Sequence, residues 1–262
     1  MNLELITKQV ANLSRSVGSY VRNEIKRVEK TKIQHKGIND FVTYVDKTSE
    51  KKLVGELAKI LPEAGFIAEE NNRLTKKDRY NWVVDPLDGT TNFIHGIPIF
   101  SISIGLMFHD EIVSGVVFEP NQQECFYAWK DGGSYLNGQQ ILVSEAGSLN
   151  DSLIATGFPY SNYSRMEGFI ETFTYLMKNT HGIRRLGSAA LDLAYVACGR
   201  FDGFFEYGLH PWDTAAGSLL VEEAGGAVSG FEGKRNFIFG KEILASNKLI
   251  YKSFLEVITD RF

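Results

Sequence analysis

The segment Asp85-Pro86-Leu87-Asp88, followed at once by Gly89-Thr90, most constrains how this chain folds. The preceding run Tyr80 to Val84 is apolar and rich in β-forming residues. It predicts a strand whose ladder stops at Pro86, because proline has no N–H to donate. The two carboxylates and the Leu87 carbonyl are oxygen ligands of the kind that Mg²⁺ binds. Gly89 permits a turn whose N–H groups face an anion. The segment therefore indicates metal and phosphate chemistry.

Other acidic residues could join this turn. Glu69-Glu70 lies 16 residues before Asp85 and follows the apolar Phe66-Ile67-Ala68, which predicts another strand end carrying a carboxylate. Asp213 stands at the start of a helical pattern that ends at Gly225-Gly226. Each has a simpler explanation, since adjacent acids are typical of a solvated loop and Asp is common at a helix N-cap. An isolated Asp-x-x-Asp turn is also common without any chemistry.

Taken together, four separated acidic elements in one order resemble the signature of the lithium-sensitive, Mg²⁺-dependent phosphomonoesterases, and among these the inositol monophosphatase family. The elements are Asp46, Glu69-Glu70, Asp85-Pro-Leu-Asp88-Gly-Thr90 and Trp212-Asp213-x-x-Ala-Gly217. The resemblance covers essentially the whole chain. It implies a layered αβαβα sandwich, two or three Mg²⁺ ions that Mn²⁺ can replace, a small phosphate monoester as substrate, and a homodimer.

The resemblance also implies roles for individual residues. The metal ligands are Glu69, Asp85, the Leu87 carbonyl, Asp88 and Asp213. The catalytic residues are Glu69 as general base, Thr90, which orients the attacking water, and Asp46, which supports the metal ligands or binds a third metal ion. The substrate-binding residues are Leu87, Asp88, Gly89, Thr90, Gly187, Ser188, Ala189, Glu206, Asp213 and Lys36. In that set Glu206 contacts the hydroxyl groups of a polyol.

Some of these residues keep an alternative reading. Gly187-Ser188-Ala189 can present N–H groups to an anion where a strand turns into a helix, or can serve close packing alone. Lys36 on a glycine-containing loop could reach a phosphate, although a loop lysine is usually solvated, and His35 lies equally near the family's loop lysine. The basic run Arg73 to Arg79 reads as a solvated hairpin without chemistry.

Composition and charge limit the class of protein and the partners that this chain can have. The chain has 262 residues, 44% of them hydrophobic, which is enough for a large core. Its net charge of -4 argues against nucleic acid or an anionic membrane as the principal partner. Only two cysteines are present, and neither a signal peptide nor a long apolar run occurs, so we expect a cytoplasmic protein. A cluster of four acids would repel phosphate unless cations reversed its charge.

The hydrophobic periodicity predicts an α+β chain of two differently wound halves. Helices are expected over Leu3 to Val28 and Lys47 to Leu61. An antiparallel meander is expected from Ile97 to Phe108, Ile112 to Phe118 and Glu124 to Trp129. Short strands at Ser152 to Ala155, Ile183 to Leu186 and Gly203 to Glu206 then alternate with helices in a mixed α/β layer. We expect residues 1–145 and 146–262 to be the halves of one compact unit.

Competing chemistries lack their signatures. The sequence has no H-x-x-x-H or C-x-x-C zinc pattern, no phosphate-binding loop of the nucleotide triphosphatases, no dinucleotide fingerprint and no G-x-S-x-G elbow. Water is therefore the expected nucleophile. Thr91-Asn92-Phe93 favours the inositol phosphatases over the nucleotide phosphatases of the same group. Two alternatives remain, a fructose-1,6-bisphosphatase or other sugar-phosphate phosphatase, and an interaction protein of a transcription or ribosomal assembly.

Overall fold

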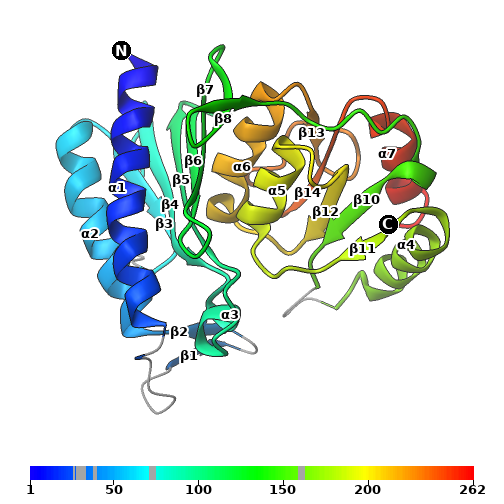
Figure 1. Cartoon of the computed structure of the whole chain (residues 1–262), viewed down its shortest axis with the longest axis horizontal. Helices are drawn as coiled ribbons and strands as arrows, with labels where there is room; N and C mark the ends of the chain where they lie inside the picture. Colours follow the sequence, from blue (N-terminus) through cyan, green and yellow to red (C-terminus); the bar gives the residue numbers. More distant parts are fainter. Residues whose placement is uncertain (26, 28–33, 38–39, 71–74, 159–162) are drawn as a thin grey trace.

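The computed structural model describes residues 1–25, 27, 34–37, 40–70, 75–158 and 163–262. Its helices and two large sheets form the layered αβαβα sandwich that the sequence predicts (Figure 1). In order across the layers lie α1 (Leu3–Glu24) and α2 (Tyr44–Ile60), a seven-stranded sheet, α5 (Ala189–Ala197) and α6 (Pro211–Glu223), a five-stranded sheet, and α4 (Met166–Asn179) with α7 (Tyr251–Thr259).

The seven-stranded sheet carries the predicted meander. Its order is β3-β4-β5-β6-β7-β8-β9, with β3 parallel to β4 and every later pair antiparallel. The strands are β3 (Gly65–Ala68), β4 (Tyr80–Asp88), β5 (Ser101–Phe108), β6 (Glu111–Glu119), β7 (Glu124–Trp129), β8 (Gly133–Leu136) and β9 (Gln139–Ile141). The bounds predicted for β7 are confirmed, because turn residues mark both of its ends.

Strand β4 runs further than the sequence predicts. Its ladder with β5 continues past Pro86, from the pair Asp85–Ser103 to the pair Asp88–Ser101 with an irregularity between them. The prediction that the ladder stops at Pro86 is therefore wrong. Two residues of β4 oppose one of β5 in this bulge, so proline's missing N–H leaves no ladder bond unmade. The N–H of Leu87 turns instead to the Asp85 carboxylate, 2.9 Å away.

The five-stranded sheet has the order β11-β10-β12-β14-β13 and mixed strand directions. Its strands are β10 (Leu153–Thr156), β11 (Gly182–Arg184), β12 (Gly203–Tyr207), β13 (Ala227–Ser229) and β14 (Glu242–Ser246). Strand β10 is parallel to both β11 and β12, whereas β14 is antiparallel to β12. The mixed α/β layer expected in the second half is thus present.

The smaller elements surround the ends of the large sheet. They are β1 (Gln34–Gly37), β2 (Asp40–Val42), the short helix α3 (Thr90–Ile94) and a 3₁₀ turn at Leu149–Asp151. Helix α2 begins at Tyr44, three residues before the predicted start, because Thr43 caps it by accepting the N–H of Val45.

One hydrophobic core crosses between the two halves of the chain. Val83 and Val117 of the first sheet belong to the same buried cluster as Leu193 of α5 and Leu220 of α6. A hydrogen bond of 3.0 Å from the Ser103 hydroxyl to the Trp212 carbonyl joins β5 to the start of α6. The division at residue 145 separates the strands of the two sheets, and as a domain boundary it stays a prediction.

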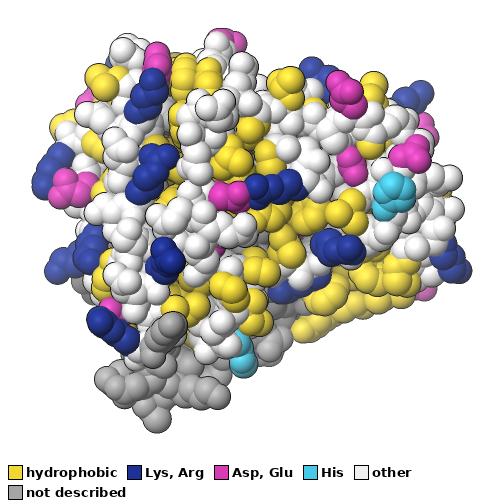
Figure 2. Space-filling model, in the orientation of Figure 1, with side chains coloured by type: hydrophobic (Ala, Val, Ile, Leu, Met, Phe, Trp, Pro, Cys, Tyr) yellow, Lys and Arg dark blue, Asp and Glu magenta, His cyan; other side chains and the backbone are white. Residues whose placement is uncertain are grey.

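The surface shows mixed charge. On the face drawn in Figure 2, basic and acidic side chains are interspersed, with apolar side chains exposed between them. Within the part of the chain that the structure describes, no helix combines the length and the apolar character needed to cross a membrane.

Candidate metal and phosphate site

The parallel strands β3 and β4 bring two acidic residues together at their carboxyl ends. The pairing of Ala68 with Val84 is followed by a hydrogen bond of 3.3 Å from the Glu69 N–H to the Val84 carbonyl. Glu69 thus leaves β3 beside Asp85 of β4. The two carboxyl groups are close enough for the charge of Glu69 to raise the pKa of Asp85.

Helix α6 adds a third carboxylate from the second half of the chain. Asp85, Asp88 and Asp213 each offer an oxygen, and these three oxygens lie within 4.8 Å of one another. Burial raises the pKa of Asp85 well above its ordinary value, and the neighbouring acids raise it further. Burial and the charge of Asp88 do the same to the pKa of Asp213. The site therefore concentrates mutual repulsion that a divalent cation would relieve, and its all-oxygen donor set suits Mg²⁺.

The start of α5 holds Asp88. One carboxylate oxygen, Oδ2, accepts hydrogen bonds from the Ser188 hydroxyl at 2.6 Å and from the Ala190 N–H at 2.8 Å. These bonds favour the charged form, yet burial outweighs them and raises the pKa of Asp88 to about 6. The turn Gly187-Ser188-Ala189, predicted to face the substrate, therefore lies at the site and serves Asp88 directly.

Asp46 anchors the helix-opening turn of α3. Its fully buried carboxylate accepts the N–H of Thr43 at 2.8 Å and the Thr43 hydroxyl at 2.5 Å through Oδ2. Its other oxygen lies 3.0 Å from the Thr90 hydroxyl, which is also 2.9 Å from the Leu87 carbonyl. A hydroxyl has one proton, so Thr90 donates to one of these acceptors at a time. Asp46 thus combines a capping role at the start of α2 with a contact to Thr90.

Gly89 adopts a left-handed backbone conformation, with φ of 95°, which is consistent with the turn expected at this glycine. It precedes α3, and the carbonyl of Gly89 accepts the N–H of Phe93 at 3.0 Å. The turn is tied to the second half of the chain by Asn92, whose amide donates 2.8 Å hydrogen bonds to the carbonyls of Ile99 and Leu186. The α3 turn and the α5 turn are therefore held side by side.

Glu206 of β12 approaches the same site from the five-stranded sheet. Its carboxyl group packs on Gly157, where a Cβ atom would lie 1.9 Å from the Glu206 carboxyl carbon, so a larger residue at position 157 would displace the carboxyl group. Burial raises the pKa of Glu206 to about 8, while the charge of Arg185 lowers it and that of Asp88 raises it. These charge interactions place Glu206 near both Arg185 and Asp88.

Sequence reasoning missed three residues around the site. Arg185 and Asp192 interact electrostatically with both Glu206 and Asp88. Asp192 is 1% exposed, and burial raises its pKa well above the ordinary value. An acid inside the apolar run of α5 was the available signal, since a fully buried Asp is rare without a purpose. The third residue, Glu50, is buried on α2 one turn after Asp46.

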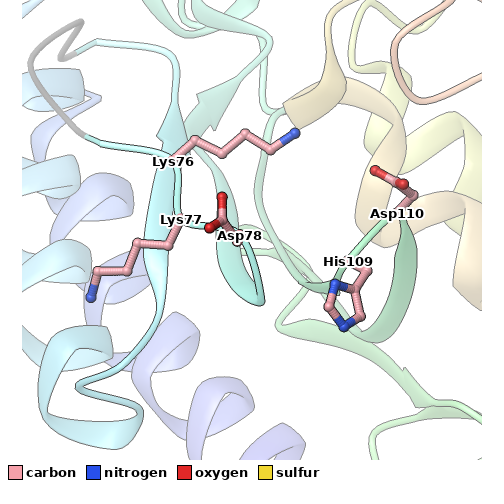
Figure 3. A pocket seen from close by; sticks show the side chains of 5 residues that line it. All are labelled: Lys76, Lys77, Asp78, His109 and Asp110. Carbon is pink, nitrogen blue, oxygen red and sulfur yellow. The ribbon is translucent and has the colours of Figure 1, made fainter.

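Neither Lys36 nor the pocket in Figure 3 adds a described side chain to the acidic cluster. The backbone of Lys36 belongs to β1, but its side chain falls outside the described residues, so its phosphate contact stays a prediction.

The pocket in Figure 3 is lined by Lys76, Lys77, Asp78, His109 and Asp110. It sits where Tyr80 pairs with Phe108, at the opposite end of β4 from Asp85. It contains none of the predicted site residues.

Comparisons with known proteins agree with this arrangement. The sequence pattern described as "Inositol monophosphatase family" matches residues 2–260. Nus factor SuhB of Pseudomonas aeruginosa is 41% identical over 250 residues, which cover 94% of this chain and 92% of that protein. Inositol-1-monophosphatase of Mesorhizobium japonicum is 39% identical over 242 residues, 92% of this chain and 91% of that protein.

Solved structures show the same fold. Extragenic suppressor protein SuhB from Bartonella henselae superposes with a TM-score of 0.91 at 38% identity, covering 100% of both chains. An IMPase from Thermotoga maritima gives a TM-score of 0.87 at 37% identity and covers 95% of both chains.

Proposed function

This chain belongs to the inositol monophosphatase family, and we propose that it is a Mg²⁺-dependent phosphomonoesterase that converts myo-inositol 1-phosphate and related inositol monophosphates to inositol and phosphate. One observation carries the proposal: oxygens of Asp85, Asp88 and Asp213 lie within 4.8 Å of one another, with Glu69 near Asp85 and the Gly89 turn directly after Asp88. This combination of oxygen ligands and backbone donors suits a metal and a phosphate together.

The proposed metal ligands are Glu69, Asp85, the Leu87 carbonyl, Asp88 and Asp213, for two or three Mg²⁺ ions that Mn²⁺ can replace. The hydrogen bonds from Ser188 and Ala190 both reach Oδ2 of Asp88, and Oδ1 is the oxygen proposed to bind a cation. When bound, Mg²⁺ supplies the positive charge that activates water and neutralises the phosphate oxygens. Without that charge, the carboxylates would repel a phosphate monoester.

The protein's own groups divide the remaining work. Glu69 accepts the proton of the attacking water as general base. Thr90 orients that water through its hydroxyl oxygen, because its hydroxyl proton is directed to Asp46 or the Leu87 carbonyl. The N–H groups of Gly89 and Thr90 bind phosphate oxygens at the start of α3. Attack in line with the departing oxygen then breaks the ester bond without a phosphoenzyme, and the alkoxide takes a proton from solvent water to leave as the alcohol.

Substrate choice is assigned to Glu206, with Gly187-Ser188-Ala189 and Lys36 completing the substrate site. With a pKa near 8, Glu206 can both donate and accept hydrogen bonds at neutral pH, which matches the hydroxyl groups of a polyol. The absence of a side chain at Gly157 leaves room for the Glu206 carboxyl group. The same acidic core could serve a sugar bisphosphate, since fold and core do not select among phosphate esters.

A substrate panel tests the assignment. Phosphate release is measured with Mg²⁺ from inositol 1-phosphate, fructose 1,6-bisphosphate, a 3′-phosphoadenosine nucleotide and an aryl phosphate. We expect the highest kcat/KM for inositol 1-phosphate, by about tenfold or more. A tenfold preference for fructose 1,6-bisphosphate would show that this compound, and not inositol 1-phosphate, is the substrate. No phosphate release from any of the four compounds would overturn the phosphatase proposal.

A binding role in transcription is a second candidate. It is favoured by the name Nus factor SuhB, carried by relatives from Pseudomonas aeruginosa and Escherichia coli that are each 41% identical to this chain. The discriminating experiment compares wild type and an inactive site variant, Asp88→Asn, for binding to purified RNA polymerase elongation complexes from the source organism. Equal, saturable binding by both proteins supports a role independent of catalysis, and no binding by either removes it.

A further inference from the structure

Helix α2 carries two buried carboxylates one turn apart, Asp46 and Glu50, on the face that meets the seven-stranded sheet. Residues four apart on a helix share one face. Asp46 contacts Thr90, the residue assigned to orient water. Glu50 accepts a hydrogen bond of 2.8 Å from the N–H of Glu70, the neighbour of Glu69. The same helix thus touches both segments assigned to activate water.

We propose that Glu50 is a positioning residue, which holds the peptide of Glu69 and Glu70 so that the Glu69 carboxylate faces the metal ligands of β4. The inference rests on the proposed function and assigns a further residue to it. Glu50 acts through the backbone of Glu70 and is not itself a metal ligand in this scheme.

The position of Glu70 explains why such a hold is needed. The last residue of β3 is Ala68, which pairs with Val84, and the Glu69 N–H still reaches the Val84 carbonyl at 3.3 Å. One residue later the N–H of Glu70 is directed to α2 and bonds the Glu50 carboxylate. The chain at Glu69 is therefore fixed from the sheet on one side and from α2 on the other.

The burial of Glu50 indicates that its carboxylate serves this contact. Its side chain is 4% exposed, and the other buried members of this stretch of α2 include Val45, Leu53 and Leu57. A carboxylate loses hydration when it is placed among such residues, and this cost is offset only by good hydrogen bonds. A bond from a backbone N–H to a carboxylate is among the stronger kinds. An apolar side chain would pack at lower cost but could not hold the Glu70 amide.

Helix α2 also sets the distance between the Asp46 contact and the Glu50 contact. Four residues of helix rise by about 6 Å, so the contacts of Asp46 and Glu50 are separated by one rigid turn. Thr90 and the Glu69 segment are then placed relative to each other by a single helix, although they come from different parts of the sheet. Moving Glu50 away should therefore weaken metal binding through Glu69 before it disturbs the rest of the fold.

The test measures Mn²⁺ binding to the 262-residue chain by electron paramagnetic resonance, for wild type, Glu50→Ala, Glu50→Gln and a control variant. Glu56→Gln is the matched control, because Glu56 lies on the same helix, is exposed and pairs with Lys59. We expect Glu50→Ala to raise the Mn²⁺ dissociation constant about tenfold. Glu50→Gln keeps an acceptor oxygen and should stay within about threefold of wild type, as should Glu56→Gln. Equal Kd values for wild type and Glu50→Ala would overturn the proposal.

A double-mutant cycle separates positioning from general damage. If Glu50 acts through Glu69, adding Glu50→Ala to Glu69→Gln changes the Mn²⁺ dissociation constant by less than about twofold, because the residue being positioned is already altered. If Glu50 has only a structural role, the tenfold effect persists in the Glu69→Gln background, and the proposal fails. Circular dichroism at the binding temperature verifies that each variant is folded.

This readout is independent of the substrate. If the protein binds Mn²⁺ with the predicted coupling but releases no phosphate from any ester, the proposed function fails and the role of Glu50 in metal binding stands. If phosphate is released normally but the cycle is additive, the positioning role fails and the proposed function stands.

Discussion

The hydroxyl group of Thr90 lies 3.0 Å from a carboxylate oxygen of Asp46, 44 positions earlier in the chain. This contact joins the first residue of α3 to the first turn of α2, and Asp46 is fixed in turn by the N–H and the hydroxyl of Thr43. The Thr90 proton thus has two fixed acceptors, this carboxylate and the Leu87 carbonyl, before any substrate arrives. A water molecule near Thr90 then meets an oxygen acceptor in a fixed orientation.

Replacing Thr90 by valine keeps the shape of the side chain and removes its hydroxyl. We expect kcat for inositol 1-phosphate to fall at least about 100-fold, in the range typical of lost proton-transfer or water-positioning groups, with KM within about threefold of wild type. Thr90→Ser keeps the hydroxyl and should retain at least a tenth of the activity. Steady-state kinetics checks both, and a Thr90→Val enzyme within twofold of wild-type kcat contradicts the assigned role.

Glu206 is predicted to recognise the alcohol and not the phosphate. Glu206→Gln should raise KM for inositol 1-phosphate about tenfold, because a hydrogen bond to substrate hydroxyls is weakened, and leave an aryl phosphate almost unchanged. The two substrates are compared with the same enzyme preparation. Equal losses on both would place Glu206 in the structural framework, next to Gly157, and remove it from substrate recognition.

The metal-free protein should lose stability as the pH rises. Burial raises the pKa of Asp88 to about 6 and that of Glu206 to about 8 in the folded state, above the values near 4 of an unfolded chain. The folded state therefore holds these protons more tightly than the unfolded chain. The folding free energy gained in this way is fully present below about pH 4, and it is lost as the pH rises through 6 for Asp88 and through 8 for Glu206.

Thermal unfolding in EDTA from pH 5 to pH 8.5 measures this effect. The Tm should fall steadily, and Mg²⁺ should restore it more strongly at pH 8.5 than at pH 5, since the metal binds the deprotonated carboxylates. Glu206→Gln serves as the control and should flatten the part of the curve between pH 7 and pH 8.5. A Tm that does not change with pH in EDTA would show that the acids are not held as the structure indicates.

Lithium is expected to inhibit. Li⁺ is close to Mg²⁺ in size but carries half its charge, so it can enter a weak oxygen site and stabilise the departing phosphate poorly. The proposed weak site comprises Glu69, Asp85 and Asp213 and is completed by substrate or product, so inhibition should be uncompetitive with substrate. A series in substrate and LiCl, with NaCl and KCl at equal ionic strength, checks it. Competitive inhibition, or an equal effect of NaCl, contradicts this account.

Local patterns predicted much of the fold. The strand Glu124–Trp129 has the expected bounds because turn residues flank it, and the meander and the mixed second sheet follow from similar alternation. Pro86 misled the prediction of β4, since a bulge lets the ladder pass a residue without an N–H. Whether a strand ends or bulges depends on its partner, here β5, which the sequence of β4 alone does not contain.

The site was predicted as a set of residues and not as a set of contacts. The acids near Asp85 are recognisable from their spacing, but the hydrogen bonds that hold Asp88 come from Ser188 and Ala190, 100 and 102 positions away. Glu50 left a local signal, because it stands four positions after Asp46 on one helix face. Its partner, the Glu70 N–H, is a backbone group and leaves no mark in the sequence.

The most direct test of the central claim is the Mg²⁺ dependence of phosphate release from inositol 1-phosphate by wild type and by Asp88→Asn. Asp88 is chosen because it belongs to the acidic cluster and accepts a hydrogen bond from the start of α5. We predict no release by wild type in EDTA, full activity on adding Mg²⁺, and at least a 100-fold lower rate for Asp88→Asn at saturating Mg²⁺, with an EDTA-state Tm at pH 8 equal to or above that of wild type. Wild-type turnover by Asp88→Asn, or full wild-type activity in EDTA, would contradict the account.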